Sequence, residues 1–347
     1  MTNLQTIRNS LIGVLSDFVT EAGFEAAELK LIVDLVYEIS DFREENSVYF
    51  PNVYLFKKNG GDALSAVAPG ADRISLKEIV FKDRVAGAVL KDAATLAESG
   101  WSIFIRVESN NLQYGIFRSE VLPISVSSSE QMADTTAPSG TVVLIRNCAK
   151  NCVELTTGSG AKLELALTPD KPETKSVASA FVFLAEKITA DIKVRREEIQ
   201  PYIERLLFNI IQKCHGTIIV VVPTGEFPEN LSDGVVLEQK IDLLAAFEDL
   251  RKDKSAEALA RLNSQEAVLR GMVNSDGITV LSTDCKILAF RCFVKPTDSE
   301  RDTLDAIEIN GGARSRAHEL LKLRIGNPLT CVFFRSQDGQ TQCTVNK

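Results

Sequence analysis

The chain of 347 residues has little histidine, no excess of positive charge and no long apolar run. Its formal net charge is −8, so a general duplex-DNA-binding surface is not expected, because such surfaces are basic. No apolar run approaches the roughly 20 residues of a membrane span, so no membrane partner is expected. The segment from Met1 to Phe24 is amphipathic and acidic rather than signal-like. The sequence therefore predicts a cytoplasmic protein.

Two histidines, His215 and His318, and seven cysteines are available for metal or nucleophilic chemistry. Cys148 and Cys152 have the spacing of half a zinc site, but no second pair has a suitable spacing, and zinc sites need four ligands. An odd number of cysteines in a cytoplasmic chain indicates free thiols. We therefore expect neither a zinc centre nor histidine-based nucleophilic catalysis, and we expect His318 on the polar surface of a helix.

The composition, 45% hydrophobic and 25% charged, is ordinary for a soluble globular protein, and the length allows two domains. The order of the elements predicts an α/β protein with an α+β N-terminal domain at 1–170. Residues 171–214 are predicted to form one or more connecting helices. Residues 215–347 are predicted to form a mixed sheet flanked by helices. The sequence shows no internal repeat and no low-complexity tail.

Apolar spacing predicts the elements of the N-terminal domain. Helices are expected at 4–22 and 26–41, and one or two more at 75–97. A surface loop is expected at 125–140. Strands are expected at 53–56, 101–107, 114–117 and 141–145, with a hairpin at 153–167.

The prolines at 169–172 mark the expected domain boundary, and Pro201 is expected to kink or break the helical stretch 176–213. The β-branched run 217–222 predicts a strand buried on both faces, and a turn follows at 223–226. Further strands are expected at 235–237, 278–281, 287–293, 329–334 and 343–345. Further helices are expected at 240–251, at 257–272 and from Ala313.

The last seventy residues contain the residue types that nucleotide chemistry needs. The turn Asp276-Gly277 precedes an apolar run, and one acid on a tight turn can hold a divalent metal. The triplet Arg314-Ser315-Arg316 follows Gly311-Gly312, where helix-start amides favour anions and arginine adds bidentate phosphate contacts. Each feature alone also fits an ordinary turn or a solvated helix start. Together, in this order and in an α/β domain, they indicate metal and phosphate binding.

Residues 214–347 resemble the diadenylate cyclase (DAC) superfamily of nucleotide-handling domains. The resemblance rests on short motifs in a specific order: Gly216 to Val221, Gly234 to Leu237, Ile241 to Phe247, Asp276-Gly277-Ile278, Gly312 to Ala317 and Cys331 to Phe334. The stretch from Leu90 to Gly100 looks like a variant group, DACNV. That group is regarded as a nucleotide sensor of prokaryotic conflict and anti-phage systems.

The resemblance implies roles for individual residues. It implies that Asp276 binds Mg²⁺ or Mn²⁺ and acts in catalysis with Arg314 and Arg316. The other residues implied at the nucleotide site are Gly277, Gly312, Ala313, Ser315, Glu226, Ser336 and Gln337. The family's Thr and His are replaced here by Ala313 and Ser315, and the acidic pair of its last turn by Arg335 to Gly339. Asp338 and Glu226 are candidates for a second metal ligand.

Three functions are compatible with this pattern. The first is a metal-dependent nucleotidyltransferase that joins two nucleoside triphosphates 3′–5′ into a cyclic or linear dinucleotide. In the family two such domains meet face to face, so this function requires a homo-oligomer. The second is a sensor that holds a nucleoside triphosphate or a dinucleotide without turning it over and regulates a separate effector protein. The third is an interaction domain at 1–170 joined to a vestigial pocket.

Overall fold

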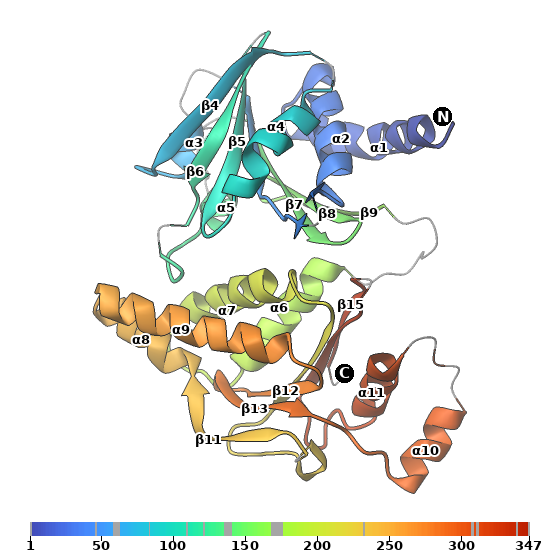
Figure 1. The fold of residues 1–347 in the computed structure, drawn as a ribbon. Coiled ribbons are helices and arrows are strands. Elements are labelled where there is room, and N and C mark those ends of the chain that lie inside the picture. Colours follow the sequence, from blue (N-terminus) through green and yellow to red (C-terminus); the bar gives the residue numbers. More distant parts are fainter. Residues whose placement is uncertain are drawn as a thin grey trace. The chain divides into compact units, whose positions relative to one another are not determined.

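The computed structural model describes residues 2–45, 47–57, 63–82, 84–108, 110–120, 122–134, 141–167, 176–231, 233–306, 309, 312–337 and 339–345. The chain divides into two compact units, Met1–Lys171 (unit 1) and Pro172–Lys347 (unit 2). Each unit combines helices with a mixed β-sheet (Figure 1), which confirms the expected α/β class. The predicted proline boundary at 169–172 lies outside the described residues.

Unit 1 begins with the helical pair α1 (Thr2–Glu21) and α2 (Ala26–Ile39). Its seven-stranded sheet has the order β4-β6-β5-β3-β7-β8-β9, with β3 parallel to β5 and the other neighbours antiparallel. The strands are β3 (Val53–Lys57), β4 (Arg73–Val80), β5 (Trp101–Glu108), β6 (Asn111–Arg118), β7 (Thr141–Ala149), β8 (Cys152–Thr157) and β9 (Lys162–Ala166). The connections contain α3 (Ala63–Val67), α4 (Ala86–Ala93), η1 (Ala94–Leu96) and α5 (Ser128–Asp134), and β1 (Arg43–Glu44) pairs separately with β2 (Ser47–Val48).

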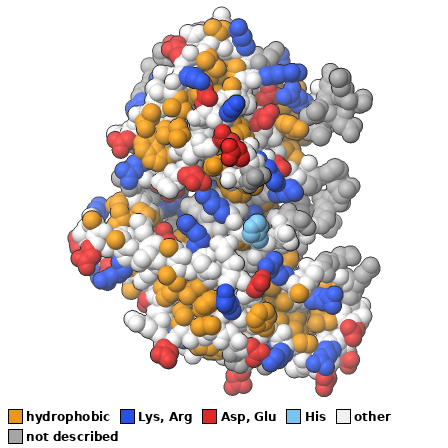
Figure 2. Space-filling model, in the orientation of Figure 1, with side chains coloured by type: hydrophobic (Ala, Val, Ile, Leu, Met, Phe, Trp, Pro, Cys, Tyr) orange, Lys and Arg blue, Asp and Glu red, His pale blue; other side chains and the backbone are white. Residues whose placement is uncertain are grey.

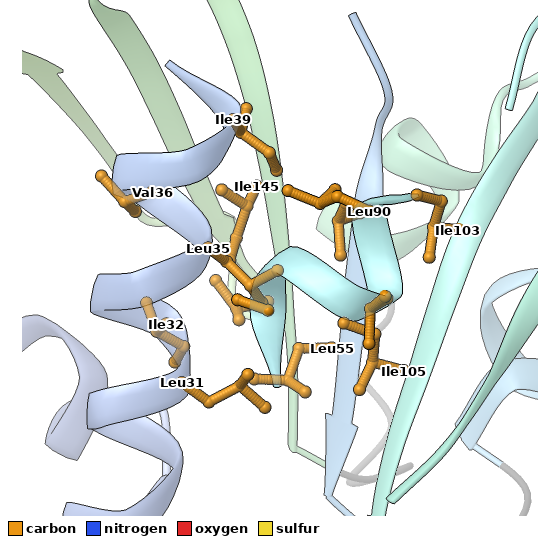
Figure 3. Close-up of a cluster of buried hydrophobic side chains, with 14 of the residues drawn as sticks. Leu31, Ile32, Leu35, Val36, Ile39, Leu55, Leu90, Ile103, Ile105 and Ile145 are labelled. Atoms are coloured by element: carbon orange, nitrogen blue, oxygen red, sulfur yellow. The ribbon is translucent and has the colours of Figure 1, made fainter. Parts of the chain in front are cut away.

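One hydrophobic core of unit 1 lies between its sheet and the helices α2 and α4 (Figure 3). Apolar residues recur along α2 every three or four positions, so Leu31, Leu35 and Ile39 share one face of the helix. Figure 3 shows this face turned toward Leu55 of β3 and Ile145 of β7. Each fully buried side chain of this kind stabilises the fold by about 1.5–3 kcal/mol. The apolar stripe of α2 therefore fixes how the helix lies on the sheet.

Two predictions for unit 1 are wrong in part. Residues 75–97 were expected to be helical, but residues up to Val80 belong to the edge strand β4 and helix α4 begins at Ala86. Ile74 and Leu76 have the alternating spacing of a strand, but Leu76 and Ile79 also have the spacing of a helix. The segment forms a strand because it pairs with β6. The loop expected at 125–140 contains helix α5. Serine is common both in loops and at helix starts, so composition did not separate them.

Unit 2 begins with α6 (Val177–Ile188) and α7 (Arg196–Ile211). Its six-stranded sheet has the order β11-β13-β12-β10-β14-β15, with β10 parallel to β12 and the other neighbours antiparallel. The strands are β10 (Thr217–Val222), β11 (Val235–Asp242), β12 (Ile278–Ser282), β13 (Lys286–Cys292), β14 (Cys331–Arg335) and β15 (Thr341–Val345). The connections contain η2 (Glu229–Leu231), α8 (Leu243–Lys252), α9 (Ala256–Val273), α10 (Asp298–Asp305) and α11 (Ala313–Lys322).

Helices cover both faces of the unit 2 sheet, as the fully buried strand β10 requires. Ile218, Val220 and Val222 of β10 lie in one core cluster with Leu321 of α11. Side chains alternate along a strand, so the intervening residues of β10 face the other layer. On that side Phe333 of β14 packs against Phe181 of α6, with ring centroids 5.4 Å apart. Helix α11 is therefore held on the opposite face from α6.

Three details of unit 2 differ from the sequence prediction. The helical stretch 176–213 breaks at 189–195, where Arg195 has a left-handed φ of 59°, whereas Pro201 stands inside α7. Residues 240–242 continue strand β11, and α8 begins only after Asp242, whose carboxylate accepts a hydrogen bond from the Ala245 amide. Helix α10 was not predicted, because it is acidic and has no buried residue. Helices without an apolar stripe leave no periodic signal.

The surface bears on the expected absence of membrane and duplex-DNA partners. Within the described part of the chain, no helix has both the length and the apolar character needed to cross a membrane. On the face shown in Figure 2, the described Lys and Arg side chains are interspersed with Asp and Glu side chains. This mixture differs from the basic stripe typical of a duplex-DNA interface.

Candidate functional site

Several of the residues predicted to bind a nucleotide lie at one edge of the unit 2 sheet. Strands β10 and β12 are parallel neighbours, and β14 is antiparallel to β10. The starts of β10 and β12 therefore share an edge with the end of β14. Asp276-Gly277 precedes β12, His215-Gly216 precedes β10, and Ser336-Gln337 follows β14. The topology thus gathers residues that are more than 100 positions apart in the sequence.

Arg314 links this edge to the start of helix α11. Its Nη2 donates a hydrogen bond to Oδ1 of Asp276 at 2.9 Å, and its Nη1 donates to the backbone oxygen of His215 at 3.4 Å. Residues three or four apart share a helix face, so Arg314 stands one turn before His318 and two turns before Leu321 on the side that faces the sheet. The guanidinium of Arg314 therefore reaches over the sheet edge.

Arg316 lies on another side of α11. Two residues along an α-helix correspond to a rotation of about 200°, so Arg314 and Arg316 point in different directions. The Arg316 side chain is exposed, and its backbone amide donates to the oxygen of Gly312 at 3.2 Å. Among the described contacts, the structure brings Arg314 but not Arg316 to Asp276.

The start of α11 is open to an anion. Gly312 is the N-cap residue, and it has no side chain that could accept a hydrogen bond from the first amides of the helix. The exposed Ala313 and the half-buried Ser315 follow it at the first and third helical positions. Uncapped amides and the helix dipole both favour negative charge at this end.

The Asp276-Gly277 turn depends on its glycine. Gly277 has a left-handed φ of 102°, and a Cβ at this position would lie 2.8 Å from the Cα of Arg291. The Asp276 side chain is 86% exposed, so its carboxylate is accessible to solvent cations as well as to Arg314. An exposed ion pair is worth only about 0–1 kcal/mol, so a phosphate could replace Asp276 as the partner of Arg314.

Arg291 is a basic residue of this edge that the sequence did not reveal. It lies against Gly277 at the end of β13, where the pairing of β12 with β13 is irregular. Its φ of 55° is left-handed, and its side chain is exposed. Such bulges redirect side chains and are frequent beside functional sites. Arg291 belongs to no sequence motif, and the sequence predicts only that it lies in a strand.

Ser336 and Gln337 also lie at this edge. A Cβ on Gly216 would be 3.1 Å from the backbone nitrogen of Gln337 and 3.1 Å from the carbonyl carbon of Ser336. The Ser336 hydroxyl accepts a hydrogen bond from the Gln340 amide at 3.0 Å and so closes the turn after β14. Gln337 is exposed. Asp338, a candidate metal ligand, lies outside the described residues.

Glu226 is placed at the opposite edge of the sheet. It follows the end of β10, and the six residues of that strand span about 20 Å at 3.3 Å per residue. The neighbouring Phe227 lines a cavity of about 440 Å³ in which Arg324 and Glu300 form an ion pair at 2.9 Å. The structure therefore does not bring Glu226 together with Asp276.

His318 is buried, which corrects the expectation of a polar surface position. It lies on α11 as predicted, but it is only 3% exposed and stacks on Phe334 with ring centroids 4.7 Å apart. Burial lowers the pKa of His318 to about 4, so the ring is neutral near pH 7. Its Nε2 atom has no hydrogen-bond partner among the described residues. His318 follows Arg314 by one helical turn, so the two residues share a face of α11. This spacing could have predicted that His318 faces the sheet.

The expected free thiols are seen at the cysteine positions. All seven are free and buried. Burial raises the pKa of the Cys214 thiol, although the nearby Arg335 and Arg314 lower it in part. Burial also raises the pKa of Cys148 to about 12, so this thiol is protonated at neutral pH.

A divalent metal at this edge would depend on Asp276. Among the described residues, no group of three or more His, Cys, Asp or Glu side chains is placed to hold a metal ion. Mg²⁺ is often bound through one or two carboxylates together with substrate phosphates. The residues present therefore suit Mg²⁺ or Mn²⁺ shared with a nucleotide better than a metal bound by the protein alone.

No protein-family model matches the chain, and no curated protein matches it. The resemblance to the DAC superfamily therefore stays a prediction that rests on the motifs themselves.

Proposed function

We propose that unit 2 binds a nucleotide through its phosphates and serves as a cytoplasmic nucleotide sensor. The observation that supports this most strongly is the position of Arg314, which contacts Asp276 and the His215 backbone at the uncapped start of α11. Arginine is suited to this role because its planar guanidinium binds phosphate bidentately. The helix-start amides next to Arg314 supply further donors for the same anion.

Local charge favours a polyanionic ligand. Arg314 pairs with Asp276, the Arg291 backbone lies against Gly277, and Arg316 stands in the first turn of α11, so basic residues gather near this carboxylate in a chain with net charge −8. A nucleoside triphosphate or a dinucleotide has the phosphates to use this charge. When a phosphate takes the place of Asp276 beside Arg314, the lost ion pair costs at most about 1 kcal/mol. Ligand binding is therefore compatible with the exposed pair seen in the structure.

The sensor function requires an output. Binding energy that differs between two conformations shifts their populations, and a partner can respond to that shift. The DACNV resemblance supports prokaryotic nucleotide signalling, with anti-phage defence as its setting. The partner that would respond is a separate effector protein.

A second candidate, a nucleotidyltransferase that makes a dinucleotide, is favoured by the exposure of Asp276. Its carboxylate is 86% exposed at the same edge as Arg314. A divalent metal shared by Asp276 and the ligand would supply charge neutralisation for phosphoryl transfer. Arg314 and Arg316 would hold the triphosphate, and a second subunit in a homo-oligomer would present the other nucleotide. The resemblance to the DAC superfamily supports this reaction. The family's acidic pair is replaced in this chain, however, and that replacement supports the sensor.

One experiment separates the two candidates. The purified full chain is incubated with all ribo- and deoxyribonucleoside triphosphates, Mg²⁺ and Mn²⁺, and bound and released species are identified by mass spectrometry. Retention of an unchanged nucleotide that is lost in Arg314→Gln supports the sensor. A dinucleotide that is absent with Asp276→Asn supports the nucleotidyltransferase.

The matched control is Arg261→Gln on α9. Arg261 is exposed and paired with Asp249 at 3.0 Å, as Arg314 is paired with Asp276. It lies 12 residues before the end of α9, which corresponds to about 18 Å along the helix axis. Neither retention nor product with the unmodified chain, or equal loss in Arg261→Gln and Arg314→Gln, would contradict both candidates.

A further inference from the structure

The two sheets of the chain have the same topology. In unit 1 the strand order is β4-β6-β5-β3-β7-β8, and in unit 2 it is β11-β13-β12-β10-β14-β15. Taken in chain order, β3 to β8 correspond one by one to β10 to β15. Each corresponding pair also has the same sense, with β3 parallel to β5 as β10 is parallel to β12. Strand β9 is the one addition at the edge of the unit 1 sheet.

The helices correspond as well. A helical pair precedes the first strand of each sheet, α1 with α2 in unit 1 and α6 with α7 in unit 2. Helices lie between the second and third strands, α4 in unit 1 and α8 with α9 in unit 2. The helix before the fifth strand is α5 in unit 1 and α11 in unit 2. Met132 of α5 packs with Tyr54 and Phe56 of the first strand, as Leu321 of α11 packs with Ile218.

The turn before the third strand is also shared. Gly100 precedes β5 with a φ of 89°, and Gly277 precedes β12 with a φ of 102°. Both conformations are left-handed and favour glycine. The residue before the glycine differs, because unit 1 has Ser99 where unit 2 has Asp276. Unit 1 therefore keeps the turn but lacks its carboxylate.

The helix starts differ in a way that bears on anion binding. In unit 1 the Ser127 amide donates to Oε2 of Glu130 at 2.7 Å, and the Glu130 amide donates to Oγ of Ser127 at 3.3 Å. This reciprocal pair is a capping box, in which the Ser127 hydroxyl caps the Glu130 amide of α5 and the Glu130 carboxylate accepts from the Ser127 amide just before the helix. In unit 2 the N-cap residue is Gly312, and no side chain of the described residues caps α11. Residues 127–134 contain no Arg or Lys, whereas α11 has Arg314 and Arg316 in its first turn.

We infer that the chain is a tandem duplication of one fold, in which unit 2 keeps an open anion site and unit 1 has closed the equivalent position with Glu130. The Glu130 carboxylate occupies the end of α5 that would otherwise attract a phosphate, and it repels a second anion. Each chain therefore takes one nucleotide, through unit 2, and none through unit 1. The count of one rests on the proposed function, whereas the duplication does not.

The count is tested by native mass spectrometry of the full chain in a mixture of ATP, GTP, CTP and UTP. We expect one nucleotide per chain, and none after Arg314→Gln. The double variant Ser129→Arg, Glu130→Ser places in α5 the residues that stand at the corresponding positions of α11, and we expect it to bind a second nucleotide. Two nucleotides on the unmodified chain, or one on the double variant, overturn the closure by Glu130.

The duplication is tested without any ligand. A crystal structure of the full chain should show β3 to β8 superposed on β10 to β15 with the same order and sense, and the capping box at α5. A different strand order in either unit overturns the duplication. Binding of no nucleotide by the unmodified chain, with the two topologies confirmed, would refute the proposed function and the count but leave the duplication intact.

Discussion

At the scale of single residues, the pairing of Arg314 with Asp276 sets the charge that a ligand meets. The pair is exposed, so it contributes little to the fold, and each member is accessible to a new partner. Without a metal, Asp276 repels phosphate at the place where Arg314 attracts it. With a metal, the same carboxylate becomes attractive. The sign of the Asp276 contribution to affinity therefore depends on the divalent ion.

We predict that Asp276→Asn raises nucleotide affinity in EDTA by about fivefold, the equivalent of removing about 1 kcal/mol of charge repulsion. The free energy of unfolding should change by less than about 1 kcal/mol. Titration calorimetry measures the affinity, and urea unfolding measures the stability. Asp249→Asn, which removes the carboxylate paired with Arg261, serves as the control. Weaker binding of Asp276→Asn in EDTA would mean that the carboxylate accepts a hydrogen bond from the ligand.

His318 gives the chain a stability that depends on pH. Its folded pKa of about 4 lies below the ordinary value of 6.5, because burial disfavours the charged ring. Between these values the unfolded chain binds a proton that the folded chain does not. The contribution of neutral His318 to the free energy of unfolding is therefore fully present above pH 6.5, and it is lost as the pH falls toward 4.

We predict that up to about 3 kcal/mol of this stability is lost between pH 6.5 and pH 4. His318→Leu should flatten the pH dependence in this window, even if it changes the stability at pH 7. Urea unfolding at a series of pH values measures the difference between the two slopes. The exposed His215→Leu is the control. Identical slopes for His318→Leu and the unmodified chain would show that His318 titrates normally in the fold.

At the scale of elements, glycines in two settings have opposite effects. Gly277 has a left-handed φ, and a side chain there would meet the backbone of Arg291. Gly271 lies inside helix α9, where an added Cβ meets nothing within 4 Å. Gly271→Ala should therefore stabilise the chain by about 1 kcal/mol.

We predict that Gly277→Ala destabilises the chain by at least about 1 kcal/mol and also weakens nucleotide binding in the presence of Mg²⁺, because the turn that presents Asp276 must shift. Thermal unfolding and titration calorimetry on both glycine variants provide the comparison. Equal effects of the two substitutions on stability would contradict the strain assigned to the turn.

The elements that were predicted correctly have sequence patterns that fit only one kind of structure. The β-branched run of β10 and the apolar stripe of α2 each fit one kind of element and one kind of burial. The edge strand β4 is mostly exposed, so its few apolar residues fit both strand and helix spacing. Pro201 stands inside α7, where tertiary packing outweighs the local preference of proline. Such elements are decided by contacts that a linear pattern does not contain.

The candidate site was predictable to a similar degree. Asp276 and Arg314 stand in recognisable motifs, and the structure places them 2.9 Å apart. Glu226 had no motif of its own, and it lies at the other edge of the sheet. Arg291 could not be found from the sequence, because only the pairing of β12 with β13 brings it to the turn. The sequence motifs therefore did not predict the order of strands in the sheet, which determines the residues that meet at the site.

At the scale of the whole molecule, each unit has its own hydrophobic core. One set of buried clusters belongs to residues of unit 1, and another cluster to residues of unit 2. Domains with separate cores can fold alone. The repeated topology escaped the sequence because equivalent positions, such as Ser99 and Asp276, hold different residues. A fold depends on the pattern of burial more than on residue identity.

We predict that residues 172–347, expressed alone, fold cooperatively and retain nucleotide affinity within a factor of about three. Circular dichroism during thermal unfolding and titration calorimetry test both parts of this prediction. Residues 1–171 should also fold but should bind no nucleotide. A fragment 172–347 without a cooperative transition would show that its core is completed by unit 1.

The most direct test of the central claim is the binding of inorganic triphosphate, measured by calorimetry in EDTA, which removes any contribution of the base or of a metal. We predict that the unmodified chain binds it and that Arg314→Gln weakens binding by at least about tenfold, the loss of a charge-assisted hydrogen bond. Arg261→Gln should bind as the unmodified chain does. Equal affinities of all three proteins would contradict a phosphate site at the start of α11.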